Sequence, residues 1–498
     1  MYIRRDTQVD AAEHLSWGAK LGFGAGDVYG GGAMTVVGFL YLYFLTDVVR
    51  ISPALAGVVI LVSKVWDAVS DPIMGTLSDR TRSRWGRRRP YFLFGIPFVF
   101  LTFVALWYPV AFELEAARFA YVLVAYLFFS TVLTMVMVPY NALASELTID
   151  YDERTRISTV RIFFSSVASL VCAVVPLELV KLMSTQRQGY LLLGVVFGLL
   201  FSLPFLAVFA TTRERKEFQR AAGPVSVYCM FVEPFRVRPF VHILMMYLFA
   251  FVAIDALQSI LIYYMTYYIG RGSEANYLLG TLMVVQLVSL PVYGALSRRT
   301  SKRFAYVLAT GLWMVGMAFS LLIKPGQPAA VIYVFSGFVG FATGGVVVMI
   351  YAIFPDMPDI DELYSGERRE GVYSGMFTFM RKLSSAIGLF IISNLIQLSG
   401  YKPPEEQTVN GVTQIVEQVQ SAQFLLFMRL IFFLVPVVFL VFCLIGARFY
   451  RLTPELHKRL RTYLELRREA AATGGEYVNR EEDQALREAL GLPQRTRT

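Results

Sequence analysis

Hydrophobic residues in this chain fall into long runs that are separated by short polar segments. A helix needs about 20 apolar residues to cross about 30 Å of hydrocarbon. Twelve runs meet that length, near residues 22–48, 54–78, 91–110, 119–146, 161–182, 190–211, 240–268, 277–297, 304–323, 329–353, 373–398 and 422–446. The pattern therefore predicts an all-α polytopic membrane protein with twelve transmembrane helices.

The composition agrees with membrane insertion. Hydrophobic residues make up 56% of the 498 residues and aromatic residues 15%, above the apolar share of typical soluble domains. The first run follows a polar segment and ends without a small-residue cleavage site, so we expect a retained span and not a removed signal peptide. We find no catalytic set of nucleophile and base, no phosphate loop and no metal motif, which argues against an enzyme and against a cofactor.

Positive charge is distributed unevenly between the two sides of the predicted membrane. Lys and Arg number 20 in the segments after spans 2, 4, 6, 8 and 10, and 7 on the opposite side. Because cytoplasmic loops are enriched in Lys and Arg, we expect both termini in the cytoplasm and an inner-membrane location. These loops account for the net charge of +9, so no nucleic-acid partner is expected. The three cysteines and three histidines are widely separated and support neither a disulfide framework nor a metal site.

Two sequence echoes predict an internal repeat. The first echo joins two seven-residue segments that share five positions at an offset of 219 (294 − 75): Gly75-Thr-Leu-Ser-Asp-Arg-Thr81 and Gly294-Ala-Leu-Ser-Arg-Arg-Thr300. The second echo is a Glu-Arg pair, which starts at Glu153 and again at Glu367, at an offset of 214 (367 − 153). Equivalent loops at similar offsets indicate two parallel six-span halves with pseudo-symmetry, a fold in which the substrate lies between the halves. The expected organisation is an N-terminal half at 1–211, a cytoplasmic linker at 212–239, a C-terminal half at 240–449 and a helical cytoplasmic tail at 450–498.

Two carboxylates lie four residues apart inside the second run. Asp67 and Asp71 share one helical face, about 40° apart, since a helix has 3.6 residues per turn. A charge near the membrane centre costs about 2.5–3.5 kcal/mol, so such a pair normally marks a path for ions or protons. We expect the pair to bind a hard monovalent cation or to share a proton. The alternative is a structural salt bridge with Lys64, and the two roles are compatible.

Four more ionisable residues lie within predicted spans. Asp27 is either a substrate-site residue or one member of an ion pair that fixes the first helix. Arg161 and Lys382 are expected to face the bundle interior, where they could neutralise the acidic pair or donate hydrogen bonds to a ligand. Arg161 could instead anchor its helix at the membrane interface. Asp255 is a further candidate for the cavity.

Pro139 interrupts the fourth run and places Tyr140 and Asn141 at an expected kink. Phenol and amide groups at such a place suit a polyhydroxylated ligand, although a packing kink with satisfied polar groups is the other interpretation.

The segment Arg82-Ser-Arg-Trp-Gly-Arg-Arg-Arg-Pro90 is expected to form a cytoplasmic turn in which Arg84 and Arg87 pair with Asp79 or with helix ends. We interpret this turn as a gate and a determinant of topology.

Several motifs resemble the glycoside-pentoside-hexuronide:cation symporters of the major facilitator superfamily, as in their melibiose-permease-like members. These motifs are Lys20-Leu-Gly-Phe-Gly-Ala-Gly26, Thr46-Asp-Val-Val49, Trp66-Asp-Ala-Val-Ser-Asp-Pro-Ile-Met-Gly75, Thr81-Arg-Ser-Arg-Trp-Gly86, Val138-Pro-Tyr, Arg161-Ile-Phe-Phe, the stretch from Tyr373 to Lys382, and Phe449-Tyr-Arg-Leu. The resemblance covers nearly the whole chain and is most specific between Trp66 and Gly86. It implies alternating access, in which a sodium ion or a proton moves together with a sugar.

The resemblance also implies roles for individual residues. The acidic pair that binds the coupling cation corresponds to Asp67 and Asp71, and a threonine at the cation site corresponds to Thr134. The functional arginine of helix 5 and lysine of helix 11 correspond to Arg161 and Lys382.

Three positions depart from the melibiose-permease-like pattern. Met137 replaces an aspartate of helix 4, Asn141 replaces a sugar-stacking tryptophan, and the sugar-binding aspartate of helix 1 falls on Tyr29, two positions past Asp27. A methionine offers no ligand to sodium and no strong acceptor to sugar hydroxyls, so melibiose itself is not the expected substrate.

The predicted function is cation-coupled symport of a sugar or glycoside by a monomer, with Na⁺ or H⁺ as the coupling ion. The alternative is transport of an amphipathic solute. Eukaryotic sodium-coupled lysolipid transporters are similar in the same Trp-Asp-Ala and Asp-Pro motif. In addition, Met137 and the many aromatic residues favour a more apolar ligand.

Overall fold

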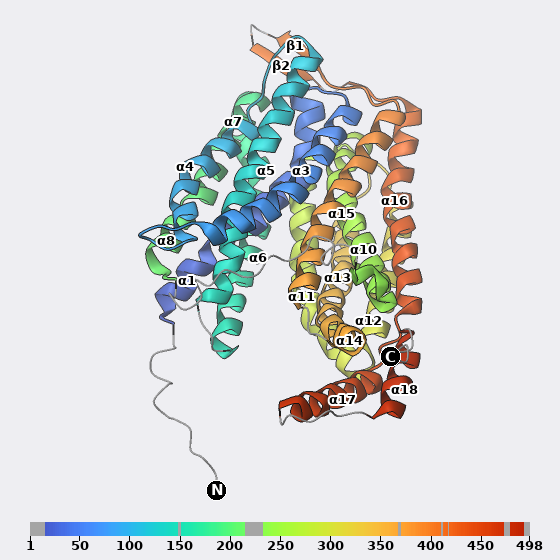
Figure 1. The fold of residues 1–498 in the computed structure, drawn as a ribbon. Coiled ribbons are helices and arrows are strands. Elements are labelled where there is room, and N and C mark those ends of the chain that lie inside the picture. Colours follow the sequence, from blue (N-terminus) through green and yellow to red (C-terminus); the bar gives the residue numbers. More distant parts are fainter. Residues whose placement is uncertain are drawn as a thin grey trace. The chain divides into compact units, whose positions relative to one another are not determined.

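The computed structural model describes residues 15–147, 151–214, 233–366, 370–409, 412–416, 418–472 and 479–492. Its first part contains α1 (Trp17–Ala25), α2 (Asp27–Val36), two π-helical turns η1 (Val37–Tyr41) and η2 (Phe44–Val48), α3 (Pro53–Arg80), α4 (Arg89–Leu106), α5 (Glu115–Glu146), α6 (Tyr151–Lys181), α7 (Gln186–Ser202) and α8 (Pro204–Thr211). These elements are coloured from blue to green in Figure 1.

The second part begins with η4 (Glu233–Arg236), α10 (Arg238–Tyr263), η5 (Tyr264–Ile269), η6 (Gly272–Glu274), α11 (Ala275–Arg299), α12 (Lys302–Ser320), α13 (Ala329–Ile353), η7 (Phe354–Asp356), α14 (Met357–Ser365) and α15 (Glu370–Leu398). It continues with the strands β1 (Glu405–Val409) and β2 (Val412–Val416), and ends with α16 (Ala422–Phe449), α17 (Pro454–Ala472) and α18 (Arg480–Leu490).

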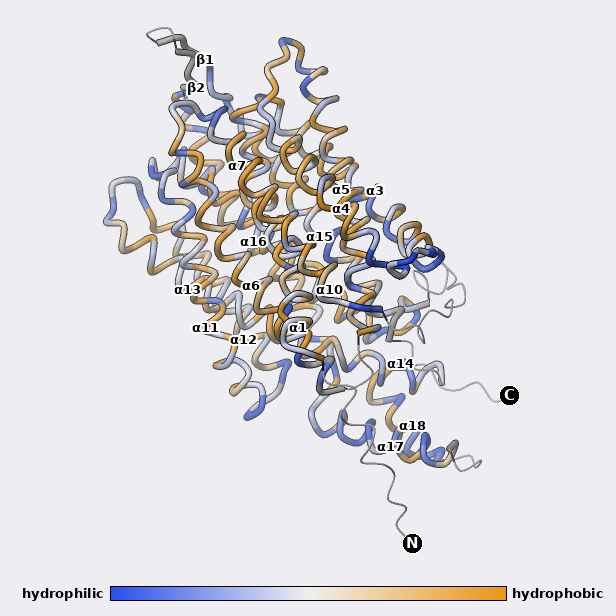
Figure 2. Tube along the Cα trace, turned by 90° about the vertical axis from the view of Figure 1, so that its left-hand side faces the viewer, coloured by the Kyte–Doolittle hydropathy of each residue, from blue (hydrophilic) through white to orange (hydrophobic). Residues whose placement is uncertain are grey.

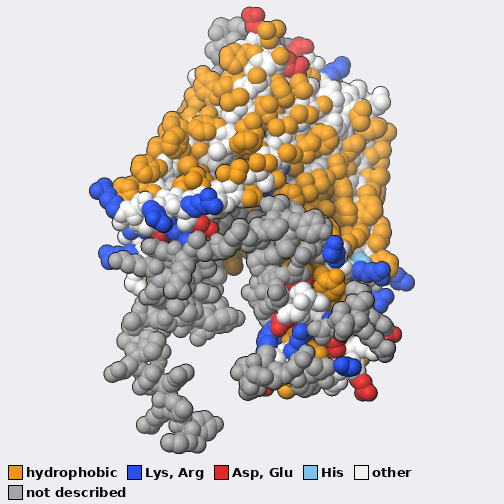
Figure 3. Space-filling model, viewed as in Figure 1, with side chains coloured by type: hydrophobic (Ala, Val, Ile, Leu, Met, Phe, Trp, Pro, Cys, Tyr) orange, Lys and Arg blue, Asp and Glu red, His pale blue; other side chains and the backbone are white. Residues whose placement is uncertain are grey.

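Eleven helices in the described part of the chain are long and apolar enough to cross a membrane. The remaining predicted span is α1 to η2, where Gly26 and the residues between the π-helical turns keep right-handed helical dihedral angles. Figure 2 shows hydrophobic residues along these helices and hydrophilic residues in α17 and α18, and in Figure 3 hydrophobic side chains cover most of the helical surface in view. The prediction of an all-α, twelve-helix membrane protein is confirmed, apart from one short hairpin.

That hairpin lies between α15 and α16. Strands β1 and β2 pair antiparallel, with Val409 opposite Val412, and the two residues between them are Asn410-Gly411. An Asn-Gly pair between β-branched residues is the strongest short-range signal for a two-residue hairpin turn. The hairpin was absent from our sequence prediction, which considered only helical runs in this region.

The chain divides into two compact units. Unit 1 contains residues 1–223 and 389–424, and unit 2 contains residues 224–388 and 425–498. The first boundary falls within the predicted linker at 212–239, while the end of α15 and the hairpin group with unit 1.

The first and seventh spans share a feature that the sequence echoes did not reveal. Each ends in a π-helical turn, η2 from Phe44 and η5 from Tyr264, at an offset of 220 (264 − 44). This offset is close to those of the two sequence echoes, as expected for a repeat of one six-helix unit.

Candidate functional site

The acidic pair of unit 1 lies where α3 packs against α5. Asp67 is buried, with 1% of its surface exposed, and Asp71 is half-buried. The Lys64 ammonium lies 3.2 Å from Asp67 Oδ2, and the Ser130 hydroxyl donates a hydrogen bond to Asp67 Oδ1. The Thr134 hydroxyl donates to Asp71 Oδ1 at 2.7 Å. The structure thus brings together the predicted residues Lys64, Asp67, Asp71 and Thr134, and adds Ser130.

Ser130 was missed by the sequence reasoning, although it lies one helical turn before Thr134 on the same face of α5. Lys64 is itself buried, and its ammonium lies 6.0 Å from the centre of the Tyr126 ring. A further contact between the two helices is the hydrogen bond of 2.8 Å from Trp66 Nε1 to the Thr131 hydroxyl. The site is therefore a cluster of hydroxyl and carboxylate oxygens on two closely packed helices, in which the Lys64 ammonium pairs with Asp67.

A second polar cluster in unit 1 joins α2, α5 and α6. Arg161 Nη2 lies 3.1 Å from Asp27 Oδ1, and its guanidinium lies 5.1 Å from the centre of the Tyr140 ring. Tyr140 donates a hydrogen bond of 2.7 Å to the Phe23 carbonyl oxygen and stacks on the Phe23 ring. Asp27, Arg161 and Tyr140 are thus neighbours, and Asp27 forms the ion pair that we considered as its alternative role.

Met137 borders this second cluster. A Cβ atom added to Gly30 would lie 2.6 Å from Asp27 Oδ1 and 2.7 Å from Met137 Cε. The glycine therefore lets the carboxylate and the thioether approach the first helix closely. Pro139 does not end the helix, since α5 continues to Glu146.

Two predicted substrate residues lie apart from these contacts. Tyr29 is fully buried, and its ring packs against Phe129, Phe201 and Phe205. A substrate role for Tyr29 does not fit this placement in an aromatic core. Asn141 is exposed near the end of α5.

In unit 2, Asp255 of α10 forms an ion pair with Arg381 of α15. Arg381 Nη1 lies 2.6 Å from Asp255 Oδ2, and Nη2 lies 3.0 Å from Oδ1. The sequence reasoning named the next residue, Lys382, which is half-buried, and did not consider Arg381. Adjacent residues on a helix point about 100° apart, so sequence alone could not decide which of the two cations meets Asp255.

The predicted gate contains an anion nest that the sequence did not reveal. Glu214, just after α8, accepts hydrogen bonds of 2.7, 2.7 and 2.9 Å from the backbone N–H groups of Arg87, Arg88 and Arg89 at the start of α4. The positive end of a helix dipole favours such a carboxylate. Gly86 has φ +109°, and a Cβ there would lie 2.6 Å from the Glu214 carboxylate, so this turn requires glycine.

The charged side chains of the gate contact each other as well. Arg88 Nη2 lies 3.0 Å and Arg87 Nη1 lies 3.9 Å from Asp79 Oδ1, so the structure places Asp79 and Arg87 together as the sequence suggested. Arg84 instead lies over the Trp85 ring, at 4.5 Å from its centre.

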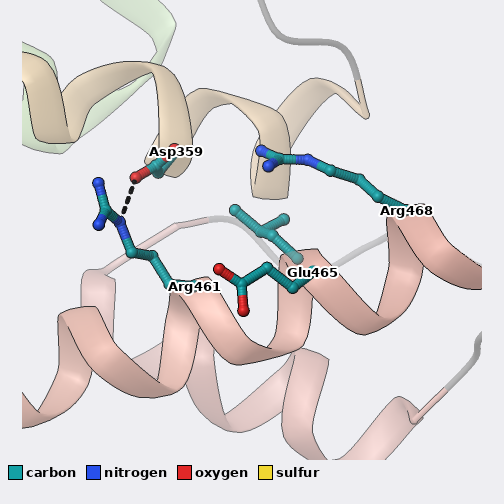
Figure 4. Close-up of a pocket in the computed structure, with 5 residues that line it drawn as sticks. Asp359, Arg461, Glu465 and Arg468 are labelled. Carbon is teal, nitrogen blue, oxygen red and sulfur yellow. Dashed lines mark hydrogen bonds and ion pairs between the residues drawn. The ribbon is translucent and has the colours of Figure 1, made fainter. Parts of the chain in front are cut away.

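A cleft of about 110 Å³ lies between α14 and α17 in unit 2. Asp359 of α14 faces Arg461, Glu465 and Arg468 of α17 (Figure 4). Arg461 Nε lies 3.4 Å from Asp359 Oδ2, and Arg468 Nε donates to Glu362 at 2.8 Å. Hydrogen bonding to Glu362 raises the pKa of the Arg468 guanidinium, so the arginine stays charged. The cleft is therefore crossed by ion pairs that hold α17 on α14.

Comparison with known proteins identifies the chain's family. The model of the MFS/sugar transport protein family matches residues 22–454, which is most of the chain. The chain belongs to this family. The resemblance seen in the sequence motifs is thereby confirmed, and the protein is a multi-pass membrane transporter and not an enzyme.

Curated relatives of this MFS/sugar transport protein agree with the family. An uncharacterized symporter, sll1374 of Synechocystis, is 29% identical over 92% of this chain and 98% of the relative. The isoprimeverose transporter of Lactiplantibacillus pentosus is 24% identical over 87% of this chain and 89% of its own length. The sphingosine-1-phosphate transporter MFSD2B of Xenopus tropicalis is 24% identical over 86% of each chain.

Solved structures share the fold. A D-xylose-proton symporter aligns with a TM-score of 0.61 at 12% identity, covering 86% of this chain and 96% of that one. At this identity the similarity concerns the fold alone.

Proposed function

We propose that this transporter is a symporter that couples the entry of a sodium ion or a proton to the uptake of a sugar or glycoside. The observation that carries the proposal is the cluster of Lys64, Asp67, Asp71, Ser130 and Thr134 inside two membrane helices. Ionisable groups are rare at such depth and mark ion or proton pathways. The names of two relatives, a symporter and an isoprimeverose transporter, are in line with this function.

The chemistry of the cluster suits a small cation. Carboxylate and hydroxyl oxygens are the ligands that hard cations prefer, and α3 and α5 hold both kinds within one small volume. The Lys64 ammonium competes for Asp67, so we expect the cation to bind mainly through Asp71 and Thr134. A bound sodium ion or proton would lower the negative charge of the cluster. Neutralisation lowers the cost of enclosing the carboxylates, and so favours reorientation of the loaded carrier.

The second cluster of unit 1 offers groups that a sugar could use. Asp27 can accept hydrogen bonds from hydroxyl groups and Arg161 can donate them, while the buried Tyr140 ring packs against the Arg161 guanidinium. We propose Asp27 and Arg161 as substrate-binding residues of unit 1, with Tyr140 positioning Arg161. For unit 2 we propose Asp255 and Lys382.

Asp71→Asn tests the proposal. This change keeps the shape of the side chain and removes the charge, so cation-driven accumulation of glycoside in proteoliposomes should fall at least tenfold while the protein still inserts. Glu178→Gln is the matched control, because Glu178 forms an exposed pair with Lys181. Undiminished accumulation in Asp71→Asn would refute the cation site.

A second candidate function is transport of an amphipathic solute such as a lysolipid. It is favoured by Met137 beside Asp27 and by the sphingosine-1-phosphate transporter among the relatives. Competition for uptake separates the two candidates: displacement of labelled glycoside by other glycosides supports the sugar, and displacement by lysolipid at lower concentration supports the lipid.

We also propose that a monomer resides in the inner membrane, with two halves at 1–211 and 240–449 and both termini in the cytoplasm. The excess of Lys and Arg in one set of loops supports this orientation. Labelling of single cysteines introduced at residues 85 and 325 from either side of the membrane would check it, since only the second should react from outside.

A further inference from the structure

An ion pair joins two membrane helices of unit 2 by two parallel hydrogen bonds. Both terminal nitrogens of Arg381 contact the carboxylate of Asp255, at 2.6 and 3.0 Å. Asp255 lies near the middle of the Arg238–Ile269 span, and its side chain is 6% exposed, whereas that of Arg381 is 35% exposed. Charged groups at this depth are costly and mark functional sites by default. The pair is therefore partly open on the guanidinium side.

Packing alone does not explain the pair. A Cβ atom added to Gly388 of α15 would lie 3.1 Å from the Val252 carbonyl oxygen and 3.4 Å from the Ala256 backbone nitrogen of α10. The two helices thus already meet closely at this glycine, about two turns from Arg381. Apolar side chains of similar volume often hold helices together as well as a buried ion pair does. We therefore expect the charges of Asp255 and Arg381 to have a role beyond helix packing.

Three aromatic rings lie near the guanidinium of the pair, and one of them is exposed. The Arg381 guanidinium lies 4.5 Å from the centre of the Phe251 ring, and Phe251 contacts the rings of Tyr247 and Tyr351. Tyr351 is 55% exposed. A carboxylate that accepts, a guanidinium that donates and flat rings that stack on C–H faces are together the groups that bind a sugar diol.

The pairing also restricts the charge of a ligand. Both terminal nitrogens of Arg381 are bound to Asp255, and Nη1 also lies 3.4 Å from the Ser384 hydroxyl. Asp255 already neutralises the guanidinium, so an anionic ligand that bound the remaining N–H donors of Arg381 would lie beside the Asp255 carboxylate without a counter-charge of its own. Burial of a charge without a counter-charge is costly, so we expect an anionic ligand to bind at least about tenfold more weakly than a neutral one. A hydroxyl pair can bind beside the intact ion pair without that loss.

We propose that Asp255 and Arg381 form a substrate-binding pair that takes adjacent hydroxyl groups of a neutral glycoside and rejects carboxylate- or phosphate-bearing substrates. This inference rests on the proposed sugar transport and specifies its substrate class. Arg381 is then a specificity-determining residue for which the sequence motifs implied no role.

Matched probes test the inference on the purified full-length protein. A panel of p-nitrophenyl glycosides is compared with the p-nitrophenyl hexuronides of the same ring configuration, which differ by a carboxylate in place of a hydroxymethyl group. Binding is measured by titration calorimetry. We expect the wild type to bind at least one neutral glycoside more than tenfold tighter than its hexuronide. Equal or tighter binding of the hexuronide overturns the proposal, and so does an absence of binding by every glycoside.

Variants assign the effect to the pair. Asp255→Asn frees the guanidinium, so it should weaken glycoside binding at least tenfold and reverse the preference toward the hexuronide. Arg381→Gln should weaken glycoside binding without that reversal. The double variant Asp255→Asn/Arg381→Gln leaves no unpaired charge and serves as the folding control. Arg459→Gln, from the exposed pair with Glu482 on α17 and α18, should change neither affinity. Wild-type glycoside affinity in the folded double variant overturns the proposal.

Failure of the proposed coupled transport and failure of the neutral-substrate inference give different results. Cation-independent uptake by the wild type refutes the coupled transport but leaves the probe comparison interpretable. A hexuronide preference under cation-coupled uptake refutes only the neutral-substrate inference.

Discussion

Replacement of Lys64 by methionine tests whether the Lys64 ammonium balances the negative charge of the acidic cluster. The Lys64 and Asp67 side chains are only 4% and 1% exposed and lie 3.2 Å apart. Lys64→Met keeps most of the apolar stem but leaves the Asp67 carboxylate buried without the ammonium. Loss of one partner of a buried pair costs about 3–5 kcal/mol of stability. At about 2–4 °C per kcal/mol for a unit of this size, Tm should fall by roughly 6–20 °C.

The same variant should become sensitive to the coupling cation. A sodium ion or proton that binds near Asp67 replaces the missing positive charge, and a ligand at a hundred times its Kd adds about 2.7 kcal/mol to the stability of the folded state. We therefore expect the Tm of Lys64→Met to rise with sodium concentration, or with falling pH, more steeply than the Tm of the wild type.

Thermal unfolding of detergent-solubilised protein in a sodium series and a pH series provides the assay. Lys64→Met/Asp67→Asn removes both charges and should recover most of the lost stability, which makes it the matched control. If Lys64→Met melts at the wild-type temperature and responds to neither series, Lys64 does not balance the acidic pair and the reasoning fails.

Three further predictions follow from named contacts. Thr134→Val should weaken cation binding about tenfold without loss of folding, because it removes the hydroxyl that donates to Asp71; cation titration of glycoside uptake checks this, and an unchanged half-saturating concentration would contradict it. Glu214→Ala should lower stability by about 0.5–2 kcal/mol, as loss of a helix cap does; a Tm equal to that of the wild type would show that the nest is dispensable. Arg468→Gln should speed hydrogen exchange in α14 and α17, because it breaks the pair with Glu362. Unchanged exchange would show that this pair does not hold α17 on α14.

Helix positions follow from the sequence because the bilayer sets the length of each apolar run. The run at 240–268 corresponds closely to α10 with η5, which ends at Ile269. Boundaries fail where a helix continues into polar sequence: α6 starts at Tyr151, ten residues before the predicted run, because the charged residues there are also good helix formers. Hydrophobicity marks the membrane segment and not the end of the helix.

Site residues were predictable where chemistry and spacing coincide within one helix. Lys64, Asp67 and Asp71 lie within two turns of α3, so their proximity could be worked out from helical geometry. Contacts between distant segments carried no such signal. Ser130 meets Asp67 and Glu214 meets the start of α4 only because of how the helices pack, and the choice of Arg381 over Lys382 as the partner of Asp255 depends on the rotation of α15.

The electrical current that accompanies glycoside uptake tests the coupling claim most directly. Adding a neutral glycoside to proteoliposomes on a solid-supported membrane, with equal cation on both sides, should produce an inward-positive current in the wild type, because each sugar enters with a cation. Asp71→Asn should produce none. Sugar uptake without current in the wild type, or an undiminished current in Asp71→Asn, would contradict the proposed symport through this acidic pair.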